Sequence, residues 1–324
     1  MKLPRRQFLR LAATAAALPV VSHVAWAQTY PSRPVRWIVG SAAGSAPDIV
    51  ARVVGPRLAE RLGQPVIIDD RPGGGGNIGT QAVVNAPADG YTLLFVTNAH
   101  AINATLYDKL NFNFIRDIAP VASLIRLPFV MVVNPSVPAK TVPEFVDYAK
   151  ANPGKLTLAS SGIGTVSHVA GELFKMMTGV NMLSVPYRSG PPALADLIAG
   201  HVQVMIDTLP SSIEHIRAGQ LRPLAVVAPM RSGALPNVPI MTDFVPGYEA
   251  SALFGIGVPK STPVEIIDRL NKETNAILTE PEIKAQLADM GSIVTLSPAE
   301  YGKLIAEETE KWSKVVKFSG AKAD

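Results

Sequence analysis

Short apolar runs alternate with longer segments of helical periodicity from residue 35 to the end of the chain. Apolar runs between turn residues are typical of buried strands, and apolar positions three or four residues apart are typical of amphipathic helices. The strands predicted in this way are 35–39, 65–69, 91–96, 129–133, 156–159, 183–185, 202–206, 224–227 and 254–258. Strands separated by helices predict an α/β fold with mixed, mostly parallel sheets.

Predicted helices lie between these strands and dominate the end of the chain. The earlier ones are 48–62, 166–177, 192–199 and 212–218, and the last ones are 263–278, 281–290 and 298–317. Each of the last ones has a proline in its first turn, after Thr262, Glu280 or Ser297 as the candidate N-cap. Because no sheet accompanies these final helices, we expect them to pack on a sheet formed earlier in the chain.

This return of the chain predicts two domains. The 297 residues after residue 27 (324 − 27) exceed what a single hydrophobic core usually holds. We expect a discontinuous domain 1 of residues 28–125 and 251–324, and a domain 2 of residues 126–250. Two crossings between the domains form a hinge beside a cleft, and ligands of α/β proteins bind in such clefts at the carboxyl ends of strands.

Residues 1–27 have the composition of a bacterial export signal. Arg5 and Arg6, followed by Gln-Phe-Leu, form a twin-arginine head, residues 11–21 are largely apolar, and residues 25–27 read Ala-Trp-Ala, a cleavage site. The apolar stretch is far shorter than the roughly 20 residues that span a bilayer. We therefore expect removal of this segment and a periplasmic protein, exported by the twin-arginine route.

Removal of residues 1–27 changes the charge balance. The segment holds four of the 30 basic residues (Lys2, Arg5, Arg6 and Arg10) and none of the 26 acidic ones, so the rest of the chain is formally neutral. A neutral chain lacks the basic stripe that binds nucleic-acid phosphates, so no nucleic-acid partner is expected. Cysteine is absent and the five histidines lack the spacing of metal ligands. We expect no metal and no cofactor.

Two Gly/Ser-rich loops join a predicted strand to a predicted helix: the first loop, residues 40–48, and the second loop, residues 160–168. Neither contains Lys or Arg. A helix N-terminus offers unpaired N–H groups and a partial positive charge, so each loop suits an anion held by backbone. Ser45 as N-cap and Asp48 reaching back to it suit the start of the first helix. Two such loops predict two walls of one cleft.

A glycine-rich stretch follows the strand 65–69. Gly74, Gly76 and Gly79 match the dinucleotide-binding fingerprint literally. A turn of Asp-Arg-Pro precedes them, however, and no acidic residue ends the next strand at the required distance. Glycines that permit a tight turn with positive φ are the better interpretation.

A hydrolase is the main enzymatic alternative. Ser160 and Ser161 with the nearby His168 resemble parts of a catalytic triad, but the Gly-x-Ser-x-Gly elbow is missing. His168 falls in the first turn of its helix, where the helix dipole disfavours the imidazolium. We expect His168 to be a neutral hydrogen-bonding residue and the protein not to be an enzyme.

Polar residues also follow two strands of the predicted domain 2. Asp207 follows the strand 202–206, where its carboxylate either accepts hydrogen bonds from a ligand ammonium or ordered water, or caps the turn 207–210. Tyr187 and Arg188 follow the strand 183–185 and offer a hydroxyl and a cation. A solvated surface position is the alternative for Arg188.

Over nearly all of its length after residue 27, the chain resembles the Bug-type periplasmic solute-binding proteins of tripartite tricarboxylate transporters. The matching stretches are DIVAR (48–52), RPGGGGNIG (71–79), ADGYTLL (88–94), SSGIGT (160–165), HVAGELF (168–174), VPYRSG (185–190) and PALADLIAG (192–200). Their order and spacing together carry the resemblance. It implies a two-lobed Venus-flytrap fold, and a small organic carboxylate held by main-chain groups and bridging waters from both loops. It also implies the large and small membrane subunits of a transporter as partners of a monomeric protein.

The loops and strand ends give the predicted ligand-binding residues. They are Ser41, Ala42, Ala43, Gly44, Ser45 and Asp48 in the first loop, Ser160, Ser161, Gly164, Thr165 and Ser167 in the second, and Tyr187 and Asp207 at strand ends. The first loop departs from the family pattern Pro-(Phe/Tyr)-x-x-Gly-Gly-x-Thr-Asp, because Ser41 replaces the aromatic residue, Ser45 a glycine and Pro47 the threonine. Loss of an aromatic wall and of one backbone donor predicts a ligand larger or more hydroxylated than a C4 dicarboxylate.

The sequence thus predicts a periplasmic protein that closes two lobes over a small carboxylate and delivers it to a membrane transporter. A periplasmic sensor that presents its closed form to a signalling receptor is one alternative, and it differs only in its partner. An exported α/β hydrolase is the other, and it requires ester turnover that depends on Ser160 or Ser161.

Overall fold

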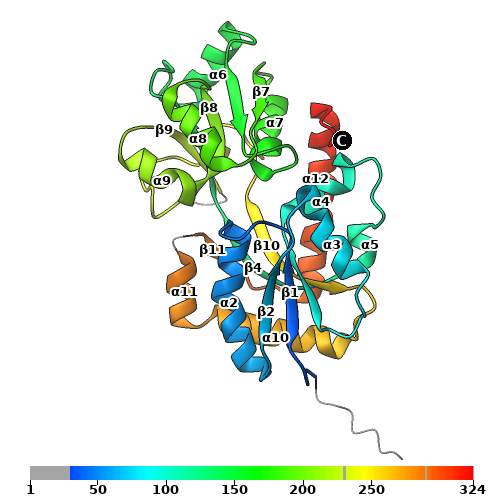
Figure 1. Ribbon diagram of the computed structural model, residues 1–324. Coiled ribbons are helices and arrows are strands. Elements are labelled where there is room, and N and C mark those ends of the chain that lie inside the picture. The colour runs from blue at the N-terminus through cyan, green and yellow to red at the C-terminus, as the bar shows by residue number, and fades with distance from the viewer. Residues whose placement is uncertain (1–29, 229–230, 289, 324) are drawn as a thin grey trace, which may run out of the picture.

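The computed structural model describes residues 30–228, 231–288 and 290–323, so the predicted export signal lies outside the described residues. The described chain forms two lobes, each built around one sheet with helices on its faces (Figure 1). Blue, cyan, orange and red segments form the lower lobe in Figure 1, and green segments form the upper one. The two-lobed α/β fold is therefore as the sequence predicted.

The sheet of the first lobe has the strand order β11-β4-β10-β3-β1-β2. Its strands are β1 (Val35–Val39), β2 (Val66–Asp70), β3 (Thr92–Val96), β4 (Ile118–Leu127), β10 (Ala252–Pro259) and β11 (Ser292–Ile293). Strand β1 pairs in parallel with β2 and β3. Strand β10 inserts antiparallel between β3 and β4, so a late segment of the chain completes the first sheet.

The sheet of the second lobe has the strand order β7-β6-β8-β5-β9. Its strands are β5 (Phe129–Val133), β6 (Thr157–Ser160), β7 (Leu183–Pro186), β8 (Val204–Thr208) and β9 (Arg222–Val227). Strand β6 pairs in parallel with β7 and β8, whereas β5 pairs antiparallel with β8 and β9. All of these strands come from the middle of the chain.

Parallel pairing is less extensive than the sequence predicted. It is confined to β1, β2 and β3 in the first sheet and to β6, β7 and β8 in the second. Each parallel group is connected through helices, as parallel crossovers require. Strands β4, β5, β9 and β10, which lead the chain out of one sheet and back into it, pair antiparallel with their neighbours.

Helices cover the faces of both sheets. They are α2 (Ala46–Leu62), α3 (Asn77–Val84), α4 (Asn98–Leu106), α5 (Phe114–Asp117), α6 (Val142–Ala151), α7 (Val166–Thr178), α8 (Gly190–Ala199), α9 (Leu209–Arg217), α10 (Val264–Leu278), α11 (Pro281–Ala288) and α12 (Pro298–Ser319). The predicted cap at Ser297 is confirmed by a capping box with Glu300. The predicted cap at Thr262 is wrong, because α10 begins after Pro263 and the Thr262 hydroxyl donates to the Pro259 carbonyl.

The final helices pack on the first lobe, as the sequence predicted. Arg61 on α2 forms an ion pair with Glu280, which lies between α10 and α11, at 2.8 Å, and Arg57 pairs with Glu282. In the core of the same lobe the ring of Phe95 stacks on Trp37 at 5.6 Å and meets Phe254 at 5.3 Å between centroids. The core of the first lobe thus depends on residues from both ends of the chain.

The chain passes between the two sheets twice, at positions far apart in the sequence. Only Pro128 separates β4 of the first sheet from β5 of the second, and the return runs from β9 to β10. The C-terminal end of α12 lies beside α7 of the second lobe (Figure 1). The Tyr248 hydroxyl, just before β10, donates to the Ala170 carbonyl of α7 at 2.7 Å. The contact of α12 with α7 therefore joins the lobes in addition to the crossing strands, whereas the Tyr248 bond holds the segment before β10 on the second lobe.

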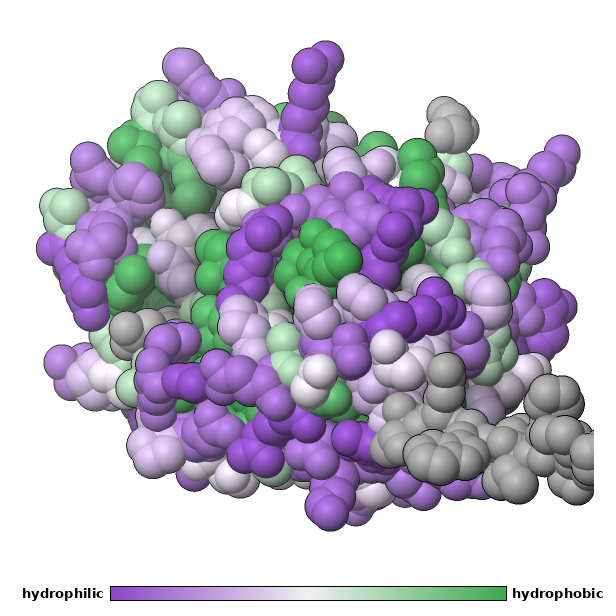
Figure 2. Space-filling view, turned by 60° about the horizontal axis from the view of Figure 1, so that its bottom comes forward, coloured by the Kyte–Doolittle hydropathy of each residue, from purple (hydrophilic) through white to green (hydrophobic). Residues whose placement is uncertain are grey.

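The face of the molecule in Figure 2 is mostly hydrophilic and carries small, separate apolar areas. None of the helices in the described ranges combines the length and the hydropathy that a membrane span requires.

Candidate ligand-binding site

The carboxyl ends of the parallel strands bring the predicted site residues to one edge of each sheet. In the first sheet the ends of β1, β2 and β3 lead into the first loop, the segment Arg71 to Gly76 and helix α4. In the second sheet the ends of β6, β7 and β8 lead into the second loop, Tyr187 and Asp207. Figure 1 shows both edges toward the middle of the molecule, between the lobes.

The first loop is shaped by Asp48, which is only 2% exposed. Its Oδ2 accepts a hydrogen bond from the N–H of Gly44 at 2.7 Å, and Gly44 has a φ of +79°. Its Oδ1 lies 2.6 Å from Nε of Arg52. Asp48 therefore holds the turn through Gly44, whereas the Ser45 side chain caps nothing in α2.

Arg52 also links Asp48 to the end of the neighbouring strand. Its Nη2 lies 2.7 Å from Oδ2 of Asp70, the last residue of β2. Burial and the negative charge of Asp48 raise the pKa of Asp70, and Arg52 opposes the shift. Two partly buried carboxylates thus share one guanidinium beneath the first loop.

Several polar groups of the first loop have no partner among the described residues. The N–H groups of Ser41, Ala42 and Ala43 donate to no described acceptor, and the buried Oγ of Ser45 makes no hydrogen bond. The N–H of Ser45 is used, because it donates to the Ala42 carbonyl at 3.1 Å. The loop therefore presents consecutive backbone donors without a basic side chain.

The glycine-rich stretch forms a tight turn against the first loop. Gly73, Gly74, Gly75 and Gly76 all have positive φ, which confirms the prediction for this stretch. A Cβ on Gly40 would lie only 2.9 Å from the Cα of Gly76. The glycines thus let two backbones touch, which places this turn directly beside the first loop.

Asn103 on α4 lies beside the glycine turn, and the sequence interpretation did not single it out. It is 2% exposed, and its Nδ2 donates to the Gly75 carbonyl at 2.9 Å and to Oδ1 of Asn77 at 3.0 Å. The buried Nδ2 of Asn77 has no partner among the residues described. The only local sequence signal for α4 is Thr97, which lies three residues before His100, the spacing of a capping box. The structure forms this capping box at the start of α4.

The second loop packs against the same helix α4. A Cβ on Gly164 would lie 2.4 Å from Cδ2 of Leu106 and 3.6 Å from Oδ1 of Asn103. Gly164, from the second lobe, therefore touches a helix of the first lobe. Through Asn103 and the glycine turn, this contact connects the two predicted loops in space.

Hydrogen bonds within the second loop use two of its four hydroxyls, those of Ser161 and Thr165. Thr165 caps α7, because its Oγ1 accepts from the N–H of His168 at 3.3 Å and donates to the Gly162 carbonyl at 2.7 Å. The Ser161 hydroxyl donates to Oγ1 of Thr165 at 3.2 Å. The N–H of Gly164 donates to Nδ1 of His168 at 3.3 Å. His168 is thus a hydrogen-bonding residue, as predicted, and burial lowers its pKa.

Ser160 and Ser167 differ in their partners. The Ser167 hydroxyl donates to the Ile206 carbonyl on β8 at 2.6 Å and so ties α7 to the sheet. Ser160, at the end of β6, is 3% exposed, and its Oγ has no partner among the described residues. Of these two hydroxyls, only that of Ser160 is free to bind a ligand or a water.

Tyr187 is held at the edge of the second sheet. Its N–H donates to the Ser160 carbonyl at 2.9 Å, and its hydroxyl donates to Oδ2 of Asp196 at 2.6 Å. Burial, together with the hydrogen bond to Asp196, raises the pKa of Tyr187 to about 12. Arg188 is exposed.

Asp207 is a buried acid, 4% exposed, at the same edge. Its Oδ2 accepts from the Ser212 hydroxyl at 3.0 Å. Burial raises the pKa of Asp207 to about 6, although the Ser212 hydroxyl, the Thr208 N–H and the charge of His215 oppose the shift. The carboxylate therefore anchors the start of α9, and its Oδ1 lies about 4.0 Å from the position of a Cβ on Gly190.

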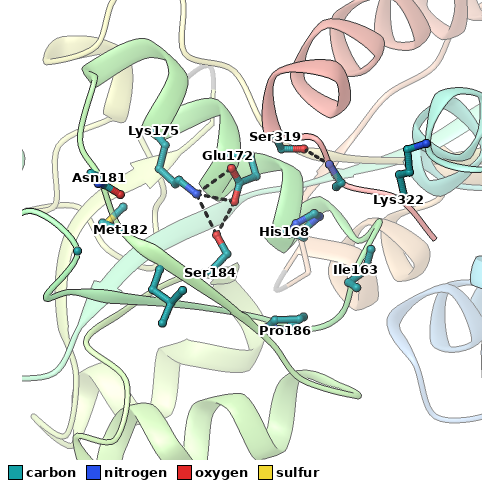
Figure 3. A pocket seen from close by; sticks show the side chains of 13 residues that line it. Ile163, His168, Glu172, Lys175, Asn181, Met182, Ser184, Pro186, Ser319 and Lys322 are labelled. Atoms are coloured by element: carbon teal, nitrogen blue, oxygen red, sulfur yellow. Dashed lines mark hydrogen bonds and ion pairs between the residues drawn. The ribbon is translucent and has the colours of Figure 1, made fainter. Parts of the chain in front are cut away.

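A cavity of about 510 Å³ lies on the α7 side of the second loop (Figure 3). His168, Glu172 and Lys175 line it from the second lobe, and Ser319 and Lys322 line it from the C-terminal segment of the first lobe. Lys175 donates to both carboxylate oxygens of Glu172, and the Ser184 hydroxyl joins them. In residues 30–228, 231–288 and 290–323, His, Asp and Glu form no group of three or more that would hold a metal ion.

Two α/β lobes with loops at facing strand ends define the class of periplasmic binding proteins, and solved members of that class share this fold. Residues 50–320 match the family described as the tripartite tricarboxylate transporter family receptor, and the chain belongs to this family. Protein BugT of Bordetella pertussis is 36% identical over 300 residues, which cover 91% of this chain and 92% of BugT.

Solved structures extend the similarity over the whole fold. Rpa4515 of R. palustris, solved with adipate, is 36% identical with a TM-score of 0.80, and the match covers 90% of this chain and 98% of that one. MatC from Rhodopseudomonas palustris, solved with bound malate, is 29% identical with a TM-score of 0.77, and the match covers 89% and 100%. The family and these relatives are solute-binding receptors.

Proposed function

We propose that the protein captures a small organic carboxylate between its two lobes. The observation that carries this proposal is the group of polar atoms at the facing sheet edges that lack partners among the described residues. They are the N–H groups of Ser41, Ala42 and Ala43, Oγ of Ser45 and Ser160, and Nδ2 of Asn77. The three side-chain atoms are buried, and buried polar atoms are usually paired. The three N–H groups lie in a half-buried to exposed stretch of the first loop, where they are open to a ligand. Their concentration at one place favours a polar ligand with its bridging waters.

Charge supports a carboxylate as this ligand. Backbone N–H groups beside the start of α2 favour an anion, and Arg52, the cation beneath the first loop, is already paired with Asp48 and Asp70. The adipate on Rpa4515 and the malate on MatC are small carboxylates, and both proteins share this fold. Ser41 in place of an aromatic wall leaves room for a ligand larger or more hydroxylated than a C4 dicarboxylate.

The binding step is a closure of two lobes. Residues 28–125 with 251–324 form one lobe and residues 126–250 the other, and they turn about the crossings at Pro128 and before β10. Binding shifts the population toward the closed form without any bond being made or broken. A micromolar Kd corresponds to about 8 kcal/mol, which two loops and lobe closure can supply.

The closed form delivers its ligand to the membrane subunits of a tripartite tricarboxylate transporter. Residues 1–27 of the chain direct its export to the periplasm, and the exported protein acts as a monomer. Family membership supports this assignment. Loss of carboxylate uptake in cells that lack the protein, restored by the full chain, would support delivery.

A thermal-shift screen of carboxylates tests the binding proposal. Succinate, adipate, malate, citrate and sugar acids are compared with neutral methyl esters of the same acids. At about 100 times Kd a ligand should stabilise the protein by roughly 2.7 kcal/mol. We expect acids bulkier than succinate to give the largest shifts and esters to give none. Esters that shift as well as acids contradict the carboxylate site, and succinate as the best ligand contradicts the size hypothesis.

A further inference from the structure

The two loops have the same local geometry although they lie in different lobes. Gly44 and Gly164 have φ of +79° and +78°. The residues after them, Ser45 and Thr165, have φ and ψ of −74° and 161° and of −76° and 159°. Each then begins a helix.

In both loops the glycine N–H donates to a side chain four residues later. Gly44 donates to Oδ2 of Asp48 at 2.7 Å, and Gly164 donates to Nδ1 of His168 at 3.3 Å. This bond withholds one N–H from any ligand and fixes the orientation of the glycine peptide. The side chain four residues on therefore decides which N–H groups of its loop face the cleft.

We propose that His168 is a positioning residue of the ligand site, a role that rests on the proposed function. The neutral imidazole accepts the Gly164 N–H at Nδ1 and carries its own proton on Nε2, and it thereby keeps the second loop in its binding conformation. An imidazolium has no lone pair left to accept this bond. Protonation of His168 therefore releases the second loop and weakens ligand binding.

The surroundings of His168 give protons access to its ring. His168 is 7% exposed and lines the cavity of about 510 Å³ shown in Figure 3. Glu172 and Lys175 on α7 and Lys322 on the C-terminal segment are the charged groups that share this cavity. Burial lowers the pKa of His168, the charge of Glu172 raises it, and that of Lys175 lowers it. The net lowering of the pKa favours the neutral ring that accepts the Gly164 N–H.

The first loop provides the matched control, because it makes the same bond with a carboxylate. Asp48 is paired with Arg52, so its bond to Gly44 does not depend on an imidazole. It also shows that a short side chain reaches the glycine N–H from this position. His168→Asn should therefore keep an acceptor for Gly164 and lose the titration.

The test measures the Kd of adipate by calorimetry from pH 5 to 8 in the full protein and three variants. For the unchanged protein we expect Kd to rise as the pH falls through the pKa of His168, by up to about tenfold once the ring is protonated, because a hydrogen bond of this kind contributes about that factor. His168→Asn should bind as the unchanged protein does at pH 7.5 and keep that Kd at pH 5. His168→Leu should bind about tenfold more weakly at every pH. Asp207→Asn should leave the pH dependence in place.

A second readout works without any ligand. The amide resonance of Gly164 should shift as His168 titrates, and it should be independent of pH in His168→Asn. A Kd that falls toward acidic pH would mean that the imidazolium attracts the anion, and this result would overturn the proposal. A Gly164 amide resonance that does not shift while His168 titrates would overturn it as well. If adipate and the other acids bind at no pH, the proposed function fails, and the Gly164 amide alone still decides whether His168 holds the loop.

Discussion

The first and second loops share their backbone angles but not their surroundings. A Cβ on Gly44 would meet nothing within 4 Å, whereas a Cβ on Gly164 would meet Leu106 of the other lobe at 2.4 Å. The first loop is thus shaped by residues of its own lobe, chiefly Asp48. The conformation of the second loop depends in addition on how closely the lobes approach each other. In the proposed mechanism, closure of the lobes would therefore act on ligand contact mainly through the second loop.

The acids at the two sheet edges also differ in their surroundings, because only one of them has an ion-pair partner. Asp70 ends β2 and is paired with Arg52. Asp207 lies in β8, and no Lys or Arg of the described chain forms an ion pair with it. Burial raises the pKa of both acids, but at the first edge the charge of Arg52 opposes the shift, whereas Asp207 has no such ion pair and its pKa is raised to about 6.

The largest expected effect is a difference in stability between variants of Gly44 and Gly164. Both Gly44→Ala and Gly164→Ala place a side chain at positive φ, which costs about 1 kcal/mol. Gly164→Ala must also displace Leu106, and overpacking of this kind adds about 1–3 kcal/mol. Urea unfolding should therefore show the greater loss for Gly164→Ala. Equal losses would mean that the contact of the second loop with α4 contributes nothing.

The next effect concerns the acid of the second edge. The pKa of Asp207 is raised to about 6 in the folded protein, above the value of about 3.9 usual for an unfolded chain. The folded state therefore holds the proton more tightly, and its stability falls as pH rises from about 4 through 6. Asp207→Asn removes this penalty.

This variant should raise the free energy of unfolding by up to about 2 kcal/mol at pH 7.5 and leave it unchanged near pH 4. Melting temperatures of both proteins at the two pH values check the sign. A variant that is less stable than the unchanged protein at pH 7.5 would show that the carboxylate has a partner that offsets its burial.

The smallest expected effect compares Ser160 and Ser167, two of the three serines of the second loop. Ser167→Ala removes the bond to the Ile206 carbonyl and should cost about 1 kcal/mol of stability with little change in affinity. Ser160→Ala removes a hydroxyl without a partner, so stability should hold while the Kd for the carboxylate rises about tenfold. Calorimetry and urea unfolding of both variants check this contrast, and the reverse pattern would exclude Ser160 from the ligand site.

The sequence predicted the fold well where local pattern determines structure. Each predicted strand has a counterpart in the structure, and both loops lie at strand ends before helices. Helix α4 was missed because Asn98 and Asn103, two of its buried residues, are polar. Asn98 donates to Glu308, 210 residues away, and that partner cannot be seen in a local window.

Site geometry was less predictable than site position. The Ser45 side chain was predicted to cap α2, but it makes no such bond. The N–H of Gly44 bonds to Asp48 instead, because Gly44 has a positive φ that turns its N–H toward the carboxylate. Likewise, the difference between Ser160 and Ser167 depends on the approach of β8, which brings the Ile206 carbonyl to only one of the two hydroxyls. In the sequence both serines lie in the same Gly/Ser-rich loop, so the sequence alone does not distinguish their roles.

The single residue between β4 and β5, Pro128, has a consequence for measurement. If the proposed closure turns about this short connection, the displacement of each residue should grow with its distance from Pro128. Spin labels or fluorophores should therefore be attached at the outer ends of the lobes, on α10 and α6. The chain contains no cysteine, so two introduced thiols label it without interference. Labels near Pro128 should report almost no change and serve as the stationary reference.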